Sequence, residues 1–190
     1  MSLETDVKKV IREHQPERSA SILMMERVPY LFSDDWDEFR QWRGSLARDL
    51  GLDPCDIFLT GSSAVGISLN PYKDFRDFRP NSDIDLAIIS PFHFDLSWRV
   101  IRATRKRDVD LQTWSIIQEH KAKYIFYGCI ACNKILPHFP FAATWLAAFD
   151  RAAKAPATFG REISARIYRD TESLRSYHVA NLRKIKSDLS

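Results

Sequence analysis

A short stretch of alternating acidic and apolar residues, Asp83-Ile84-Asp85-Leu86, constrains the fold of this chain more than any other feature. Successive side chains of a β-strand point to opposite faces, so a strand here would place the two carboxylates on one face and the two aliphatic side chains on the other. Neighbouring carboxylates repel each other, and a cation held between them relieves that repulsion. The stretch therefore predicts a strand that buries one face in the core and presents a metal-binding pair of carboxylates on the other.

Two further segments have the composition to meet this strand. Residues 55–60 are followed by the turn-forming sequence Gly61-Ser62-Ser63, and Val109-Asp110-Leu111 supplies a third aspartate between apolar neighbours. A turn that leads into a short helix would direct backbone N–H groups toward the carboxylates. Glycine lets a triphosphate approach the backbone, and the Ser62 hydroxyl can donate to a phosphate oxygen. Three aspartates that converge beside such a turn indicate phosphoryl or nucleotidyl transfer.

Together these segments resemble the signature of the DNA polymerase β-like nucleotidyltransferase superfamily. Leu59-Thr60-Gly61-Ser62, followed by Ser82-Asp83-Ile84-Asp85-Leu86, is similar to its strand end, Gly-Ser turn and aspartate-hydrophobic-acid element. Residues 61–66 look most like the bacterial minimal nucleotidyltransferases, and residues 109–113 are similar to their third-carboxylate strand. The resemblance covers residues 55–115 of the chain.

The resemblance implies a metal-dependent enzyme that moves a nucleoside monophosphate from a nucleoside triphosphate to a hydroxyl acceptor and releases pyrophosphate. Its implied catalytic and metal-binding residues are Asp83, Asp85 and Asp110, which would hold two Mg²⁺ ions, with Asp110 as the expected general base. ATP is expected as the nucleotide because of its abundance in cells. The turn residues implied to bind the nucleotide are Gly61, Ser62 and Ser63.

Between the turn and the acidic pair, residues 70–80 make the chain longer than the pattern that it resembles. The segment is bounded by prolines and alternates aromatic with charged residues, so we expect an inserted loop at the rim of the site. In one interpretation Lys73, Arg76 and Arg79 hold the phosphates or the acceptor, and the aromatic residues stack on a base. In the other, the loop is solvated and its aromatic residues only pin it in place. The resembled proteins commonly carry an arginine where this chain has Ser63.

We expect an α/β (α+β) domain with the nucleotidyltransferase fold, in which helices flank a mixed, mostly antiparallel sheet and further helices follow at the C-terminus. The length of 190 residues and the 45% hydrophobic content fit one such domain with a small helical addition. The expected divisions are an N-terminal helical extension at 1–32, a nucleotidyltransferase core at 33–137 and a C-terminal helical region at 138–190.

Within these divisions, the aromatic stripe between Trp36 and Leu50 predicts a helix that ends at Gly51. After Pro156, apolar spacing that includes Ile163 and Ile167 predicts one or two basic C-terminal helices. The apolar residues 124–137 fit either a helix or a buried strand. The segments expected as strands are 55–60, 83–89 and 108–111.

Charge and hydropathy restrict the partners. A net charge of +3 permits anionic ligands without requiring nucleic acid.

The acceptor is left open among a partner protein, an RNA end, a small molecule and a second nucleotide. The chain is short for an enzyme with its own acceptor-binding domain, which favours a macromolecular acceptor or a homodimer that completes the cleft. The charged N-terminus and the lack of an apolar run of about 18 residues predict a cytoplasmic protein with no membrane partner.

Two other classes of function remain open. The lengthened segment at 70–80 and the serine at position 63 favour a catalytically silent module, which would sense a nucleotide or bind a partner on the same fold. The remaining class is an interaction domain in which the pair of aspartates is coincidental. That class requires the Gly-Ser turn and the third aspartate to be coincidental as well.

Overall fold

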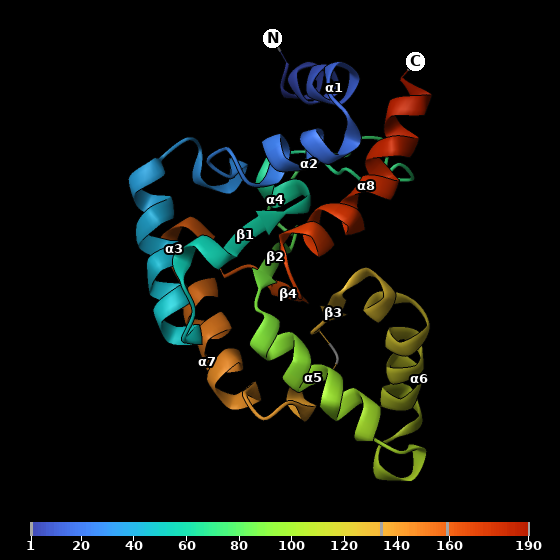
Figure 1. The fold of residues 1–190 in the computed structure, drawn as a ribbon. Helices are drawn as coiled ribbons and strands as arrows, with labels where there is room; N and C mark the ends of the chain where they lie inside the picture. The colour runs from blue at the N-terminus through green and yellow to red at the C-terminus, as the bar shows by residue number, and fades with distance from the viewer. Residues whose placement is uncertain (1, 134, 159, 190) are drawn as a thin grey trace.

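The computed structural model describes residues 2–133, 135–158 and 160–189 (Figure 1). Within these residues the strands form one four-stranded sheet, in which β2 pairs antiparallel with β1 and parallel with β4, and β3 pairs antiparallel with β4. The predicted α+β class with a mixed sheet is therefore confirmed. In spatial order the strands are β1 (Ile57–Thr60), β2 (Ile84–Ile89), β4 (Ile163–Tyr168) and β3 (Cys129–Ala131).

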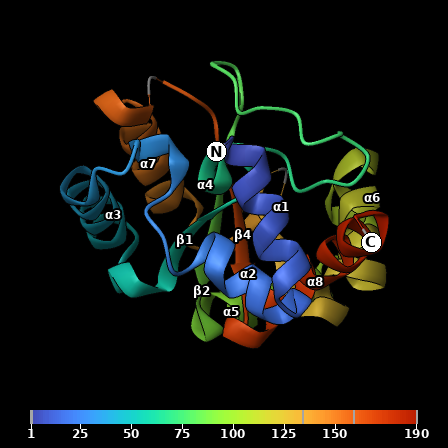
Figure 2. The same cartoon turned by 90° about the horizontal axis from the view of Figure 1, so that it is seen from above.

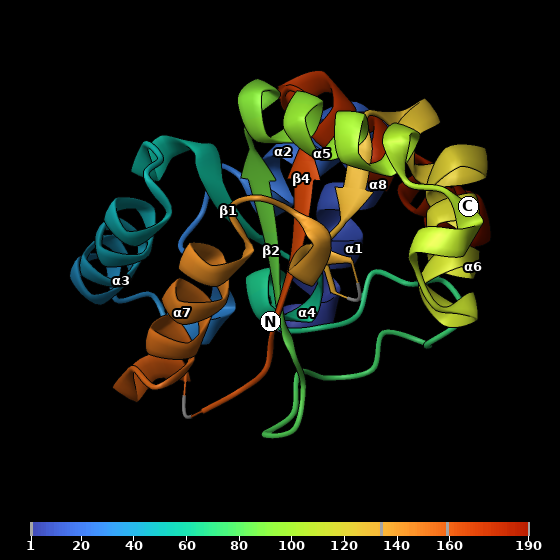
Figure 3. The same cartoon turned by 90° about the horizontal axis from the view of Figure 1, so that it is seen from below.

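Helices cover the sheet on both sides. Two of them, α3 (Trp36–Leu50) and α7 (Ala142–Ala153), lie side by side against one side (Figures 1 and 3). On the other side, α2 packs against α8, and α1 packs against both (Figure 2). The bounds of the remaining helices are α1 (Leu3–Glu13), α2 (Pro16–Met24), α4 (Gly61–Val65), α5 (Pro91–Ala103), α6 (Leu111–Glu119) and α8 (Thr171–Asp188). Among the described residues, no helix combines the length and the apolar character needed to cross a membrane.

The helix predicted over 36–50 is confirmed, and its ends follow from local chemistry. The Asp35 carboxylate accepts a hydrogen bond of 2.8 Å from the backbone N–H of Glu38, which caps the first turn of α3. Gly51, with φ +71°, ends the helix in the left-handed conformation that glycine adopts most easily. The Trp42 indole N–H donates to the backbone oxygen of Ala152, which links α3 to α7.

The alternation along β2 separates the core from the site. Ile84, Leu86 and Ile88 are fully buried in the main hydrophobic core, to which α3 and α7 also contribute. Asp85 and Ala87 therefore lie on the opposite face, where α2 and α8 pack. The predicted separation of apolar and acidic faces in this strand is confirmed.

Two secondary-structure predictions are wrong. No strand forms at 108–111, because Asp110 caps α6 and accepts hydrogen bonds from the backbone N–H of Thr113 at 2.9 Å and from its hydroxyl at 2.6 Å. Ile163–Tyr168, predicted to be helical, is instead β4. In that segment the apolar residues Ile163, Ala165 and Ile167 alternate with Ser164, Arg166 and Tyr168, a period-two pattern typical of a strand. Within residues 124–137, which fit either a helix or a strand, Cys129–Ala131 form β3.

The long segment between α4 and β2, residues 66–83, extends from the end of the sheet opposite α5 (Figure 3). An antiparallel bridge between Ile67 and Asp77 ties its two arms together. The Arg161 guanidinium donates to three of its carbonyl oxygens, including that of Arg79 at 2.6 Å. We call this segment the rim segment, because it borders a polar pocket at the start of β2.

Candidate functional site

A polar pocket of about 420 Å³ opens where β2 begins. Most of its walls come from four parts of the chain: the junction of β1 and α4, the start of β2, the rim segment, and β4 together with α8. Met24 at the end of α2 and Asn133 after β3 complete the lining. A smaller cavity of about 200 Å³ adjoins it and shares five of its lining residues. These shared residues are Ser62, Lys73, Arg76, Asp83 and Asp85.

Most of the predicted site residues line this pocket. The acidic pair, the first two residues of the turn and two cations of the rim segment meet there, although they come from positions 61 to 85 of the chain. The rim segment therefore borders this pocket, as a loop at the rim of the predicted site would. The predicted residues in the lining are Gly61, Ser62, Lys73, Arg76, Asp83 and Asp85.

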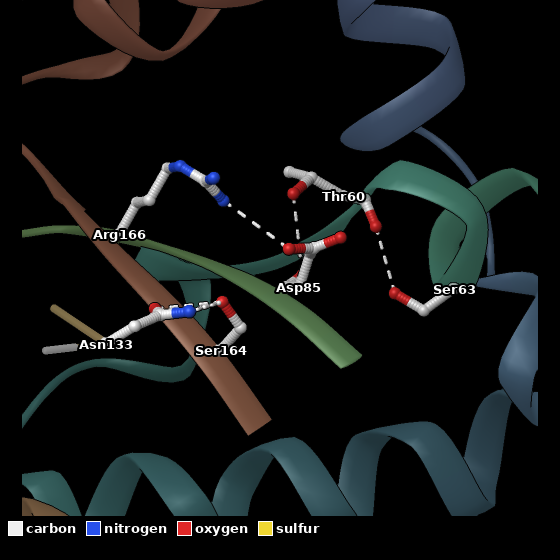
Figure 4. Close-up of polar contacts among 6 residues, drawn as sticks. All are labelled: Thr60, Ser63, Asp85, Asn133, Ser164 and Arg166. Carbon is white, nitrogen blue, oxygen red and sulfur yellow. Dashed lines mark hydrogen bonds and ion pairs between the residues drawn. The ribbon is translucent and has the colours of Figure 1, made fainter. Parts of the chain in front are cut away.

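The structure does not bring Ser63 and Asp110 to this pocket. Ser63 is a buried residue of α4, and its hydroxyl donates to the backbone oxygen of Thr60 at 2.9 Å (Figure 4). Asp110 is exposed at the start of α6, and its hydrogen bonds with Thr113 lower the pKa of its carboxyl. Ser63 thus stabilises the turn at the start of α4, and Asp110 stabilises the first turn of α6.

Replacement of Asp110 by alanine tests this assignment. We expect Asp110→Ala to lower the melting temperature by a few degrees, because α6 loses its N-cap, and to leave unchanged the nucleotide binding that the sequence predicts. Thermal unfolding and a nucleotide titration measure the two effects. Asp35→Ala, which removes the N-cap of α3, is the matched control. Loss of nucleotide binding in Asp110→Ala alone would place this carboxylate in the functional site.

Asp85 is the central residue of the pocket. In register it stands opposite Thr60 on β1 and Ser164 on β4. Its Oδ1 lies 3.4 Å from Nη1 of Arg166, which reaches across from β4 (Figure 4). On its other side, a Cβ added to Gly61 would lie only 2.7 Å from Oδ2, so the carboxylate and the turn are in close contact. Burial raises the pKa of Asp85 and Arg166 opposes that rise, so the charged form depends on nearby positive charge.

Asp83 lies one residue before β2 and is exposed, and its charge adds to the rise in the pKa of Asp85. Asp77 of the rim segment also lines the pocket. Within the described residues, however, no three His, Cys, Asp or Glu side chains are grouped closely enough to hold a metal ion. Mg²⁺ in proteins is commonly held by one or two carboxylates, with water and substrate phosphates as its other ligands. Asp83 and Asp85 fit this pattern, because they supply two hard oxygen donors at the mouth of an open pocket.

Sequence reasoning missed the wall formed by β4 and α8. Ser164 stands opposite Asp85, so this neighbouring strand presents a hydroxyl rather than a third carboxylate. The Asn133 side chain exchanges hydrogen bonds of 2.7 and 2.9 Å with that hydroxyl (Figure 4). Burial lowers the pKa of His178 on α8 to about 3, so this imidazole is neutral. The alternation of residues 163–168 was the signal that could have revealed Ser164 and Arg166.

Comparisons with known proteins add no assignment to this site. No family model matches the chain, and neither does any curated protein or solved structure. A function for this chain is therefore inferred from the residues of the pocket and from the sequence pattern that carries the resemblance.

Proposed function

We propose that this chain is a Mg²⁺-dependent nucleotidyltransferase with a DNA polymerase β-like fold. The observation that carries the proposal is the meeting of three features in one polar pocket: the carboxylates of Asp83 and Asp85, the Gly61-Ser62 turn and the cations of the rim segment. Carboxylates beside cations and a glycine turn suit a polyphosphate that arrives with a divalent cation.

Each part of the pocket has a role that follows from its chemistry. Asp83 and Asp85 would hold Mg²⁺, which supplies positive charge to the phosphates and lowers the pKa of the acceptor hydroxyl. Gly61 has no side chain and so lets the Asp85 carboxylate lie directly against the turn that would receive the phosphates. Lys73 and Arg76 are exposed on the rim segment and bind the phosphate oxygens from the other side.

In the proposed reaction, the acceptor hydroxyl oxygen forms a bond to the α-phosphorus of the nucleotide. The bond from that phosphorus to the bridging oxygen breaks, pyrophosphate leaves, and the acceptor proton passes to solvent. Asp110 lies outside the pocket and takes no part as a general base. ATP is the proposed nucleotide on grounds of abundance. A partner protein, an RNA end or a small molecule is the proposed acceptor.

A second candidate is the catalytically silent module, which would bind a nucleotide without transferring it. Two observations favour it: Ser164 stands in register with Asp85 where another carboxylate would strengthen a metal site, and Arg166 already pairs with Asp85. A silent module would keep the pocket and the nucleotide but release no pyrophosphate.

Pyrophosphate release separates the two candidates. Wild-type protein is incubated with each α-³²P-labelled nucleoside triphosphate, Mg²⁺ and a cell lysate that supplies acceptors. We expect labelled acceptor and pyrophosphate from the wild type, and neither from Asp83→Asn or after chelation of the cation. Binding without pyrophosphate release would favour the silent module. Failure to bind any nucleotide with Mg²⁺ would contradict both candidates.

A further inference from the structure

We propose that Arg166 is a phosphate-binding residue that holds Asp85 in the free protein and exchanges this carboxylate for nucleotide phosphate on binding. The inference rests on the proposed nucleotide function and adds a ligand-binding residue to it. It also predicts that Arg166 lowers the affinity for a divalent cation alone and raises the affinity for a nucleotide alone.

The position of Arg166 brings its side chain to the pocket. It lies on β4, which is parallel to β2, and stands opposite Ala87, two residues beyond the Ser164–Asp85 pair. From there its guanidinium turns back toward the pocket and reaches the Asp85 carboxylate, with 3.4 Å between Nη1 and Oδ1 (Figure 4). Both side chains are only about a third exposed, at 27% for Arg166 and 35% for Asp85. Water therefore screens this ion pair less than it screens a pair on the surface.

Arg166 and a divalent cation compete for the Asp85 carboxylate. A cation bound there would lie within a few ångströms of the guanidinium, and two positive charges at that separation repel strongly in a partly buried site. Arginine keeps its charge at every physiological pH, so deprotonation cannot relieve the repulsion. In the absence of a nucleotide, binding of the cation therefore requires Arg166 to leave Asp85.

A nucleotide phosphate offers Arg166 an alternative partner. The guanidinium lines the same pocket as Gly61 and Lys73, where the proposed triphosphate lies. Its Nε is buried and has no hydrogen-bond partner among the described residues, so its donors are incompletely used by Asp85. The planar arrangement of these donors matches two oxygens of a phosphate group. The Tyr177 ring on α8, whose centroid is 5.6 Å from the guanidinium carbon, makes a cation–π contact with Arg166.

The position of Arg166, its competition with the cation and its affinity for phosphate together predict one pattern of binding. A bound triphosphate attracts Arg166, frees the Asp85 carboxylate and brings enough negative charge for the guanidinium and the divalent cation to remain together. Nucleotide and cation then enter as a pair. Arg166 should weaken the binding of a cation alone and strengthen the binding of a nucleotide alone.

Separate titrations of the two ligands test this pattern. Mn²⁺ binding without nucleotide is followed by electron paramagnetic resonance, and ATP binding in EDTA by calorimetry. In Arg166→Met, we expect Mn²⁺ affinity to rise about tenfold and metal-free ATP affinity to fall about tenfold. Arg166→Lys keeps the charge but not the planar donors, so it should change both affinities in the same directions by less. Arg169→Met, which removes an exposed cation outside the pocket, is the control.

A structural role for Arg166 would give a different result. If Arg166→Met lowers the affinities for Mn²⁺ and for ATP in parallel, or changes neither affinity, the exchange of partners is contradicted. Wild-type protein that binds Mg²⁺-ATP but shows no affinity for ATP in EDTA would contradict it as well, while leaving the proposed function intact. Wild-type protein that binds neither ATP nor Mg²⁺-ATP would contradict the proposed function together with this inference.

Discussion

Replacement of Asp85 by asparagine is expected to weaken the binding of Mg²⁺-ATP about a hundredfold or more and to abolish pyrophosphate release. Asparagine has the same shape but no charge, so the cation would lose one of its two proposed carboxylate ligands. The backbone oxygen of Asp85, which accepts a hydrogen bond from the Thr60 hydroxyl, is unchanged. Calorimetric titration with Mg²⁺-ATP measures the loss of affinity.

The same variant carries an internal control. In EDTA its affinity for ATP should rise rather than fall, because Arg166 has lost its carboxylate partner and is free to bind phosphate. Asp95→Asn is the matched substitution elsewhere, since Asp95 is an exposed aspartate on α5 that pairs with Arg99. If the Asp85→Asn protein binds Mg²⁺-ATP as tightly as the Asp95→Asn protein does, Asp85 is not part of the binding site.

Replacement of Gly61 by alanine is expected to weaken nucleotide binding tenfold or more, beyond its effect on folding. Gly61 has φ +61°, and an added Cβ would lie 2.7 Å from Oδ2 of Asp85, so the carboxylate must move. A displaced carboxylate would no longer hold the cation next to the turn that is proposed to receive the phosphates. Calorimetry measures the affinity, and urea unfolding measures the accompanying loss of stability.

Gly51→Ala is the control for backbone strain. Gly51 has φ +71° with no atom within 4 Å of an added Cβ, so both variants carry the cost of a left-handed alanine, about 1 kcal/mol. Only Gly61→Ala also displaces the Asp85 carboxylate. Equal nucleotide affinity in the two variants would show that the approach of the turn to Asp85 has no functional role.

The parts of the fold and site that the sequence predicts are those with a local signal. The alternation in residues 83–86 indicates both the strand and the face that carries the carboxylates. The aspartate cap, aromatic stripe and closing Gly51 define α3 within the span of the helix itself. The prolines around residues 70–80 mark a loop, and its cations reach the pocket because the loop begins and ends at site elements.

The remaining features depend on contacts between distant parts of the chain or on competing local signals. Asp110 has apolar neighbours as a strand residue would, but Thr113 three positions later favours a helix cap, and this local competition prevails. Arg166 reaches Asp85 only because β4 pairs with β2, and the two residues are 81 positions apart. Spacing alone does not show which strand lies beside the acidic pair, so the role of Arg166 becomes visible only in the sheet.

The most direct test of the proposed site is a map of amide chemical-shift changes in ¹⁵N-labelled protein titrated with Mg²⁺-ATP. The expected changes are centred on Gly61, Ser62, Lys73 and Asp85, and Mn²⁺ in place of Mg²⁺ should broaden the same signals. A second cavity of comparable size is an apolar groove of about 470 Å³ between α3 and α7, lined in part by Trp42. Changes confined to that groove, or no changes at all, would contradict a nucleotide site at the start of β2.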